Sequence, residues 1–101
     1  GPDDYCMTDI FKPTCNQNEV VMIETASYGR MKPGKCFQAQ EGNFGCSTDV
    51  KNILDSLCSG KESCSVKTVN EDLIFTKPCG SSMGYLTASY SCKQGTVFLL
   101  C

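Results

Sequence analysis

The 101-residue chain has no histidine, no long apolar run and no run of basic residues. Without histidine, catalytic triads and most arrangements for general acid–base catalysis have no support. No apolar stretch approaches the ~20 residues of a membrane-spanning helix, so we expect no membrane insertion by this segment. Nine Lys and Arg residues against eleven Asp and Glu residues give a net charge of −2, and we expect no nucleic-acid partner. We predict that the protein is not an enzyme and uses no cofactor.

The spacing of the nine cysteines is not that of a zinc site. No two of them are separated by two residues, and no histidine can complete a ligand set. We therefore expect no metal site and interpret the cysteines as the disulfide framework of a small secreted or ectodomain module. Because nine is an odd number, at least one thiol is free, bonded to another chain, or paired with a cysteine beyond this sequence.

The stretch Tyr85–Cys92 alternates between two faces, which predicts a half-buried strand. One face holds Leu86, Ala88, Tyr90 and Cys92, and the other holds Tyr85, Thr87, Ser89 and Ser91. The preceding Lys77–Gly84 has the turn residues of a surface loop. A cross-linked loop that enters a buried strand would hold a recognition surface still. The alternative is a plain core strand preceded by an ordinary turn.

Glu19–Ser27 is rich in β-branched residues and reads as a central strand, because both of its faces begin apolar. The alternation places Val21, Ile23 and Thr25 on one face. The strand runs into Tyr28-Gly29-Arg30, a group that either serves binding or contains an arginine that braces a turn. We expect a further strand over Cys64–Val69.

One helix is predicted over Asp49–Cys58, because its apolar residues recur at helical spacing. These residues are Val50, Ile53, Leu54 and Leu57. Ser47, Thr48 or Asp49 can cap its start, and Gly60 suits a left-handed exit.

The remaining segments are predicted to be loops. These are 3–18, with at most a short edge strand, 37–46, and 70–77. Within the last, Leu73, Ile74 and Phe75 are expected to pack inward as a lid. After a turn, the apolar Val97–Cys101 either adds an edge strand or leads into a neighbouring domain.

Several motifs together resemble the galactose/rhamnose-binding lectin domain, also called the sea-urchin-egg-lectin type. They are the cysteine pattern, Ala26–Arg30, Pro78-Cys79-Gly80, and Tyr85-Leu86 followed by Ser89–Cys92. The resemblance covers residues 6–92. Residues 1–5 then form an N-terminal lead, in which Gly1-Pro2 is typical of a cleaved tag, and residues 93–101 form an apolar tail or linker. The run Val20–Arg30 is most similar to the N-terminal domain of latrophilins, which are adhesion receptors.

The resemblance implies a small, extracellular α+β domain, disulfide-rich and antiparallel, with one main helix. It also implies the bridges Cys6–Cys36, Cys15–Cys92, Cys46–Cys79 and Cys58–Cys64. Cys101 lies outside these eight cysteines, and we predict that it is free or forms an interchain disulfide.

The family's sugar site is only partly matched. The family commonly has a glutamate where this chain has Met7, an aspartate where it has Lys77, and a Tyr-Lys pair where it has Met83-Gly84. The resemblance therefore implies a degenerate sugar site. The predicted ligand-binding residues are Tyr28, Arg30, Asn43, Lys77, Gly80, Ser81, Ser82, Met83 and Gly84.

Two functions follow from this comparison. The first is a lectin that binds carbohydrate, and the second is a protein-recognition module in an adhesion-receptor or secreted ectodomain. Because Lys77 reverses the charge that the family commonly has, we expect an acidic partner, such as a sulfated or sialylated glycan or an acidic protein patch. We expect free galactose and rhamnose to bind with weaker than millimolar affinity, or not at all.

Overall fold

Two long antiparallel strands, β3 (Glu19–Arg30) and β6 (Tyr85–Gln94), form the centre of the molecule in a computed structural model that describes residues 1–95. The short β1 (Asp3–Tyr5) pairs with β6, and β4 (Cys46–Asp49) pairs with β3, so the sheet order is β1-β6-β3-β4. A second sheet contains β2 (Ile10–Phe11) and β5 (Val66–Lys67). The expected α+β architecture with antiparallel sheets is confirmed.

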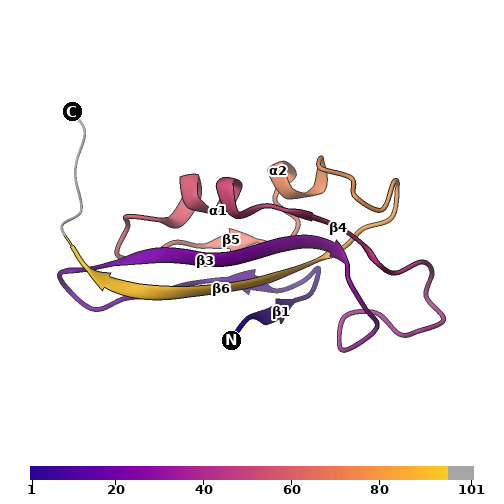
Figure 1. The fold of residues 1–101 in the computed structure, drawn as a ribbon, viewed down its shortest axis with the longest axis horizontal. Coiled ribbons are helices and arrows are strands. Elements are labelled where there is room, and N and C mark those ends of the chain that lie inside the picture. The colour runs from indigo at the N-terminus through magenta and orange to yellow at the C-terminus, as the bar shows by residue number, and fades with distance from the viewer. Residues whose placement is uncertain (96–101) are drawn as a thin grey trace.

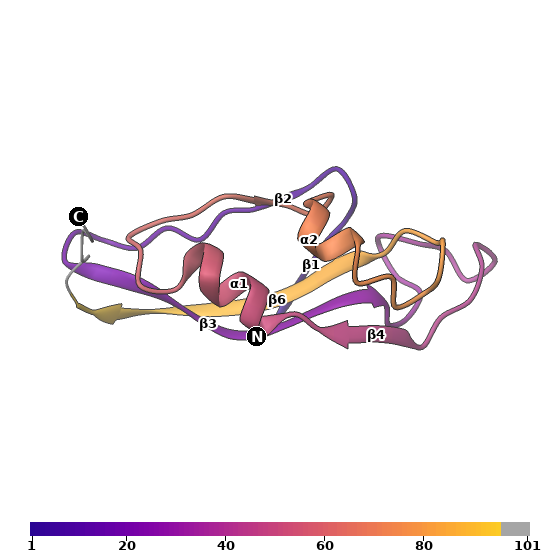
Figure 2. The same ribbon diagram turned by 90° about the horizontal axis from the view of Figure 1, so that it is seen from above.

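The helices α1 (Lys51–Cys58) and α2 (Glu71–Ile74) lie on the same face of the β3–β6 pair (Figures 1 and 2). The apolar core fills the space between them and the sheet. Its completely buried members include Phe11, Val21, Leu54, Leu73 and Leu86. In the described residues, 1–95, no helix is both long enough and apolar enough to cross a membrane.

A register shift in β3 changes which of its residues face the core. Val21 and Ile23 are buried, but Thr25, which was predicted to share their face, is exposed. The shift between Ile23 and Thr25 inserts an unpaired residue, Glu24, after which Ala26 and Tyr28 take over the core face. A bulge of this kind adds one residue to one strand and bends it. The prediction of a central strand is confirmed, whereas the face predicted for Thr25 is wrong.

All four disulfides implied by the family resemblance are present. They are Cys6–Cys36, Cys15–Cys92, Cys46–Cys79 and Cys58–Cys64. The last of these clamps the end of α1, and Gly60 leaves the helix with φ +85°, as expected. Cys101 and the rest of Val97–Cys101 lie outside the described residues.

The main helix begins later than predicted. Ser47, Thr48 and Asp49 belong to β4, and the residue that precedes α1 is Val50, whose side chain forms no capping hydrogen bond. Asp49 still accepts a hydrogen bond at 2.8 Å from the Lys51 N–H, which remains near the helix start. The strand β4 was missed because pairing with β3 outweighs the local tendency of Ser, Thr and Asp to cap a helix.

Other local predictions were also corrected. The expected loop 70–77 contains α2, whose start is capped by the Asn70 side chain. Leu73 is buried and Ile74 is half-buried, as predicted for a lid over the core. Phe75 is 66% exposed, so the prediction that it packs inward is wrong. The strand expected over 64–69 is limited to β5, and 3–18 contains the two short strands β1 and β2. Tyr90, predicted to share a face with Leu86 and Ala88, which are buried, lies at the core margin and is 38% exposed.

Candidate functional site

Two glycines allow the end of β3 to approach its neighbours closely. A Cβ atom on Gly84 would lie 2.7 Å from the Gly29 Cα, and one on Gly29 would collide with the Cys46 carbonyl oxygen. Gly29 also has φ +147°, a conformation that side chains rarely adopt. Gly29 is therefore needed because a side chain at this position would collide with β4. Its absence of a side chain lets β3, β4 and the residue that precedes β6 pack closely.

Tyr28 supports the Lys77–Gly84 loop from inside the protein. Its side chain is only 2% exposed, and its hydroxyl oxygen accepts a hydrogen bond of 3.1 Å from the Gly84 N–H. The ring is therefore not available to a ligand at the surface, although Tyr28 is among the predicted ligand-binding residues. Its place in the site is to position the loop.

Arg30 joins two loops that are far apart in sequence. Its Nε donates to the Met83 carbonyl and its Nη1 donates to the Glu41 carbonyl, each at 2.7 Å. Its Cζ lies 3.9 Å from the centre of the Phe37 ring, a cation–π arrangement. The fork of the guanidinium thus serves both loops at once, so the interpretation that Arg30 braces a turn is confirmed.

Tyr85 and Phe37 are positioning residues that the sequence prediction missed. The Tyr85 hydroxyl accepts from the Lys32 N–H and donates to the Lys32 carbonyl, both at 3.1 Å. The Tyr85 ring is buried and lies 6.3 Å from the Phe37 ring, centre to centre. The sequence did contain a signal for Tyr85. It lies on the face of its predicted strand opposite Leu86, and a large aromatic ring on that face indicates that another segment packs over it.

The Lys77–Gly84 loop is held at both ends. The Cys46–Cys79 disulfide attaches it to β4, and the contacts of Tyr28 and Arg30 attach residues 83 and 84 to the end of β3. Lys77, just before Cys79, has φ +48°, and Gly80, just after it, has φ +67°; the Gly80 N–H donates to the Lys77 carbonyl. The turn is therefore tight as well as cross-linked.

Most of the predicted ligand-binding residues remain accessible. Lys77, Gly80, Ser81, Ser82 and Asn43 are exposed, Arg30 and Met83 are half-buried, and Tyr28 and Gly84 are buried.

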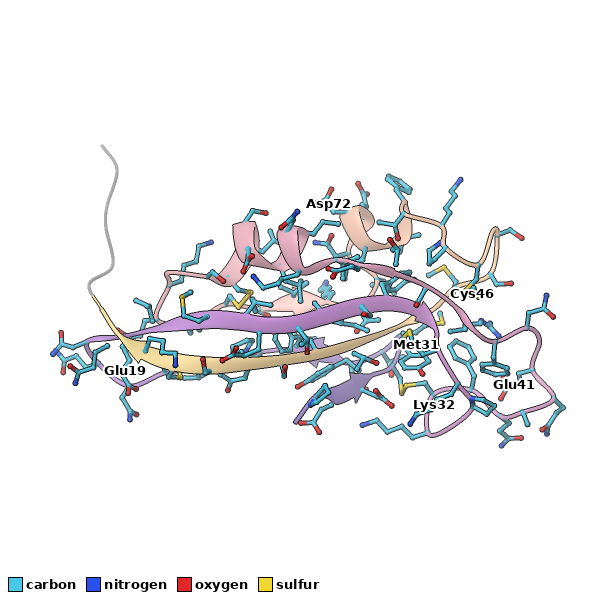
Figure 3. All side chains as sticks on the ribbon, viewed as in Figure 1. Glu19, Met31, Lys32, Glu41, Cys46 and Asp72 are labelled. Carbon is cyan, nitrogen blue, oxygen red and sulfur yellow. A yellow bond between two sulfur atoms is a disulfide. The ribbon has the colours of Figure 1, made fainter. Side chains whose placement is uncertain are left out.

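Asn43 is held beside the same arginine. It lies between Gly42, which packs against the Arg30 guanidinium, and Gly45, whose N–H donates at 2.7 Å to the Arg30 carbonyl. Figure 3 shows Glu41 and Cys46 at the same end of the molecule as Met31 and Lys32. Arg30 therefore anchors the segment that carries Asn43 together with the Lys77–Gly84 loop, which makes this end of the molecule the candidate recognition surface.

The accessible groups of this surface are hydroxyls, an amide and one ammonium group. Within residues 1–95, no cluster of three or more His, Cys, Asp or Glu residues is placed to hold a metal ion. Such groups can donate and accept hydrogen bonds, and Lys77 adds a positive charge. The arrangement suits non-covalent recognition of a polar ligand.

Comparison with known proteins identifies similar sequences. The sequence model of the D-galactoside/L-rhamnose binding SUEL lectin domain matches residues 14–92. The chain is 34% identical over 76 residues to L-rhamnose-binding lectin ELEL-1 of Echinometra lucunter, with 73% of this chain and 72% of that lectin covered. It is 32% identical over 85 residues to a rhamnose-binding lectin of Silurus asotus, which covers 79% of this chain and 27% of that lectin.

A latrophilin is also similar. Latrophilin Cirl of Drosophila persimilis is 32% identical over 83 residues, which covers 77% of this chain and 5% of that protein. The chain thus spans about a quarter of the Silurus lectin and a much smaller part of the latrophilin. The expected likeness to latrophilins is present, but at an identity that the rhamnose-binding lectins equal or exceed.

Proposed function

Since this chain belongs to the D-galactoside/L-rhamnose-binding SUEL lectin family, we propose that it is an extracellular recognition module whose braced loop surface binds an acidic glycan. The family consists of non-enzymatic lectin domains. Four disulfides in a small domain fit the oxidising conditions outside the cell. The proposed surface consists of Asn43 and the Lys77–Gly84 loop, positioned by Arg30 and Tyr28.

Lys77 is the observation that carries this proposal. Its exposed side chain follows α2 on a turn fixed by the Cys46–Cys79 disulfide, at the position where the family commonly has an aspartate. An ammonium group there favours a sulfate or carboxylate on the ligand. A hydrogen bond that involves a charged group is worth about 1.5–3 kcal/mol, so one such contact changes affinity by roughly tenfold or more.

The same substitutions weaken the binding of neutral sugars. Met7 and Gly84 offer no charged side chain where the family commonly has a glutamate and a lysine, and Lys77 replaces a carboxylate. Each missing contact removes stabilisation of about the size given above. We therefore propose that free galactose and rhamnose bind with weaker than millimolar affinity.

A glycan array that contains neutral, sulfated and sialylated galactosides, followed by NMR titration, tests this proposal. We expect signal only from the acidic glycans, with chemical-shift changes at the Lys77–Gly84 loop. The variant Lys77→Asn should abolish that signal, and asparagine tolerates the positive φ of this position. Lys61→Asn is the matched control, because Lys61 is an exposed lysine on the segment after α1. Saturable shifts at sub-millimolar free rhamnose or galactose would show an ordinary lectin instead.

A second function, recognition of a protein, is favoured by Phe75. This side chain is 66% exposed and precedes Lys77 by two residues, and exposed aromatics beside a charge are frequent anchors at protein interfaces. On this reading the parent protein is an adhesion receptor or a secreted ectodomain of latrophilin type. Staining of cells distinguishes the two functions. Loss of staining after enzymatic removal of sialic acid and sulfate supports the glycan, whereas loss only with trypsin or with Phe75→Ser supports the protein.

A further inference from the structure

A cleft on the sheet face opposite the helices lies outside the loop surface described above. Its volume is about 410 Å³, within the ~300–1,000 Å³ typical of small-molecule sites. The residues that matter for its chemistry are Asp4, Lys32, Lys35 and Thr87. Thr87 alternates with the buried Leu86 and Ala88 and so points away from the helices. Figure 3 accordingly shows Lys32 on the side of the β3–β6 pair away from Asp72 of α2.

The walls of this cleft are fixed by specific contacts. Asp4 lies opposite Thr87 in the β1–β6 register, and its Oδ1 accepts a hydrogen bond of 2.8 Å from the Thr87 hydroxyl. On the other wall, Tyr85 holds the backbone of Lys32 through the two hydrogen bonds described above. Lys35 precedes Cys36, which is bonded to Cys6 just after β1. The hydrogen bonds of Asp4 and Lys32 and the Cys6–Cys36 disulfide therefore hold the two walls of the cleft in fixed positions relative to each other.

The oppositely charged residues of the cleft form no ion pair. In residues 1–95, the one ion pair within 4.0 Å joins Lys51 and Asp55. A smaller adjoining cleft of about 340 Å³ shares Asp3, Asp4 and Lys35. No cluster suited to a metal ion was found in the same described residues. The cleft is thus lined by the carboxylate of Asp4 and by two lysines, Lys32 and Lys35.

We propose that this cleft binds a small zwitterion that carries a primary ammonium group and a phosphate monoester, of which phosphoethanolamine is the simplest example. The carboxylate of Asp4, which lies opposite Thr87 on the cleft's face, accepts hydrogen bonds from the ligand's N–H groups. A quaternary ammonium has no N–H and is recognised by exposed aromatic faces, whereas Tyr85, the one aromatic residue that lines the cleft, is buried. Lys32 and Lys35 match a phosphate monoester, whose charge is about −1.5 to −2 at pH 7. A phosphodiester, as in a lipid headgroup, carries one charge and engages fewer contacts.

NMR titration of the 101-residue chain with phosphoethanolamine tests the proposal. We expect saturable shifts at the amides of Asp4, Lys35 and Thr87, with the Lys77–Gly84 loop unchanged. Phosphocholine, ethanolamine and inorganic phosphate should each bind at least about tenfold more weakly, because each lacks one set of charged hydrogen bonds. Equal binding of any of the three, shifts confined to the loop, or no saturable shift overturns the proposal.

Variants and a membrane arm complete the experiment. Asp4→Asn, which keeps an oxygen that can accept from Thr87, and Lys35→Gln should each weaken phosphoethanolamine binding at least about tenfold. Lys61→Gln, which changes an exposed lysine outside the cleft, should have no effect. Unchanged circular dichroism of each variant confirms that the fold is intact. Vesicles that contain phosphatidylethanolamine should not bind. Binding to vesicles without binding of free phosphoethanolamine, or variants that bind like the wild type, refutes the monoester site.

Discussion

Replacing Arg30 with lysine tests the inference that a single side chain joins the two recognition loops. Arg30 is the chain's one arginine. The substitution keeps the charge but removes the planar fork, so one ammonium group cannot reach both the Met83 and the Glu41 carbonyl oxygens in the same geometry. The contact with the Phe37 ring is weakened as well.

The expected loss of stability follows from these contacts. A hydrogen bond from a charged donor contributes about 1.5–3 kcal/mol, and a cation–π contact at an exposed site contributes about 0.5–1 kcal/mol. The bond to Met83 is partly buried, whereas the bond to Glu41 is exposed and contributes less. We therefore expect Arg30→Lys to lower the free energy of unfolding by about 2 kcal/mol. For a domain of about 100 residues this lowers Tm by about 8–16 °C.

Urea unfolding followed by circular dichroism measures this loss, and amide hydrogen exchange locates it. Exchange should accelerate at Gly45 and Gly84, whose N–H groups bond to the Arg30 carbonyl and the Tyr28 hydroxyl, respectively. Lys61→Arg provides a control in which an exposed lysine changes without new contacts. A loss below about 0.5 kcal/mol, which is ordinary for a surface substitution, together with unchanged exchange at both glycines, would refute the coupling of the loops by Arg30.

Three further predictions concern packing, pH and disulfides. Gly84→Ala should destabilise the domain by about 1–3 kcal/mol in urea unfolding, because its Cβ would lie 2.7 Å from the Gly29 Cα. The hydrogen bond from Lys51 lowers the pKa of Asp55 below its ordinary value of 3.8. The ionised Asp55 therefore stabilises the folded state at pH values above 3.8, and this contribution is lost as the pH falls through the pKa of the folded state. Below pH of about 4, the wild type should lose slightly more stability than Asp55→Asn when melting temperatures are compared. Replacing both Cys46 and Cys79 with serine should lower stability by about 2–4 kcal/mol and accelerate hydrogen exchange across the Lys77–Gly84 loop.

Each of these predictions has a control and an outcome that contradicts it. Gly34→Ala should be nearly neutral, since a Cβ there meets no atom within 4 Å; equal effects at Gly34 and Gly84 would remove the packing argument. Parallel pH profiles of the wild type and Asp55→Asn would show that this pair does not couple to folding. Protection of the loop that persists after removal of the Cys46–Cys79 bridge would show that the hydrogen bonds hold it unaided.

The sequence predicted the features that depend on pattern and on family resemblance. Alternation and β-branched residues located the two central strands, helical spacing located α1, and the family's cysteine order supplied the four bridges. What it missed depends on pairing between distant segments. The strand β4 forms because Cys46–Asp49 lies beside β3, and the bulge at Glu24 reverses an alternation that looks regular in sequence.

The site was predicted less completely than the fold, because the roles of its residues depend on the third dimension. Tyr28 was expected at the surface and lies in the core, while Phe75 was expected in the core and lies at the surface. Tyr28 and Phe75 are both aromatic. The residues next to each of them in sequence do not indicate whether a distant segment of the chain covers its ring. The roles of Phe37 and Tyr85 as positioning residues likewise depend on contacts with segments far along the chain.

The Cys15–Cys92 bridge has a consequence for a domain that is pulled by its ends. It joins residues separated by 77 positions, and the whole recognition surface lies between them. Tension applied before Cys15 and after Cys92 passes directly from one sulfur to the other. Everything from Asn16 to Ser91 lies on a side branch of that path and is not stretched. A recognition module placed between other domains of an adhesive protein would therefore keep its loop geometry under a mechanical force that extends its neighbours.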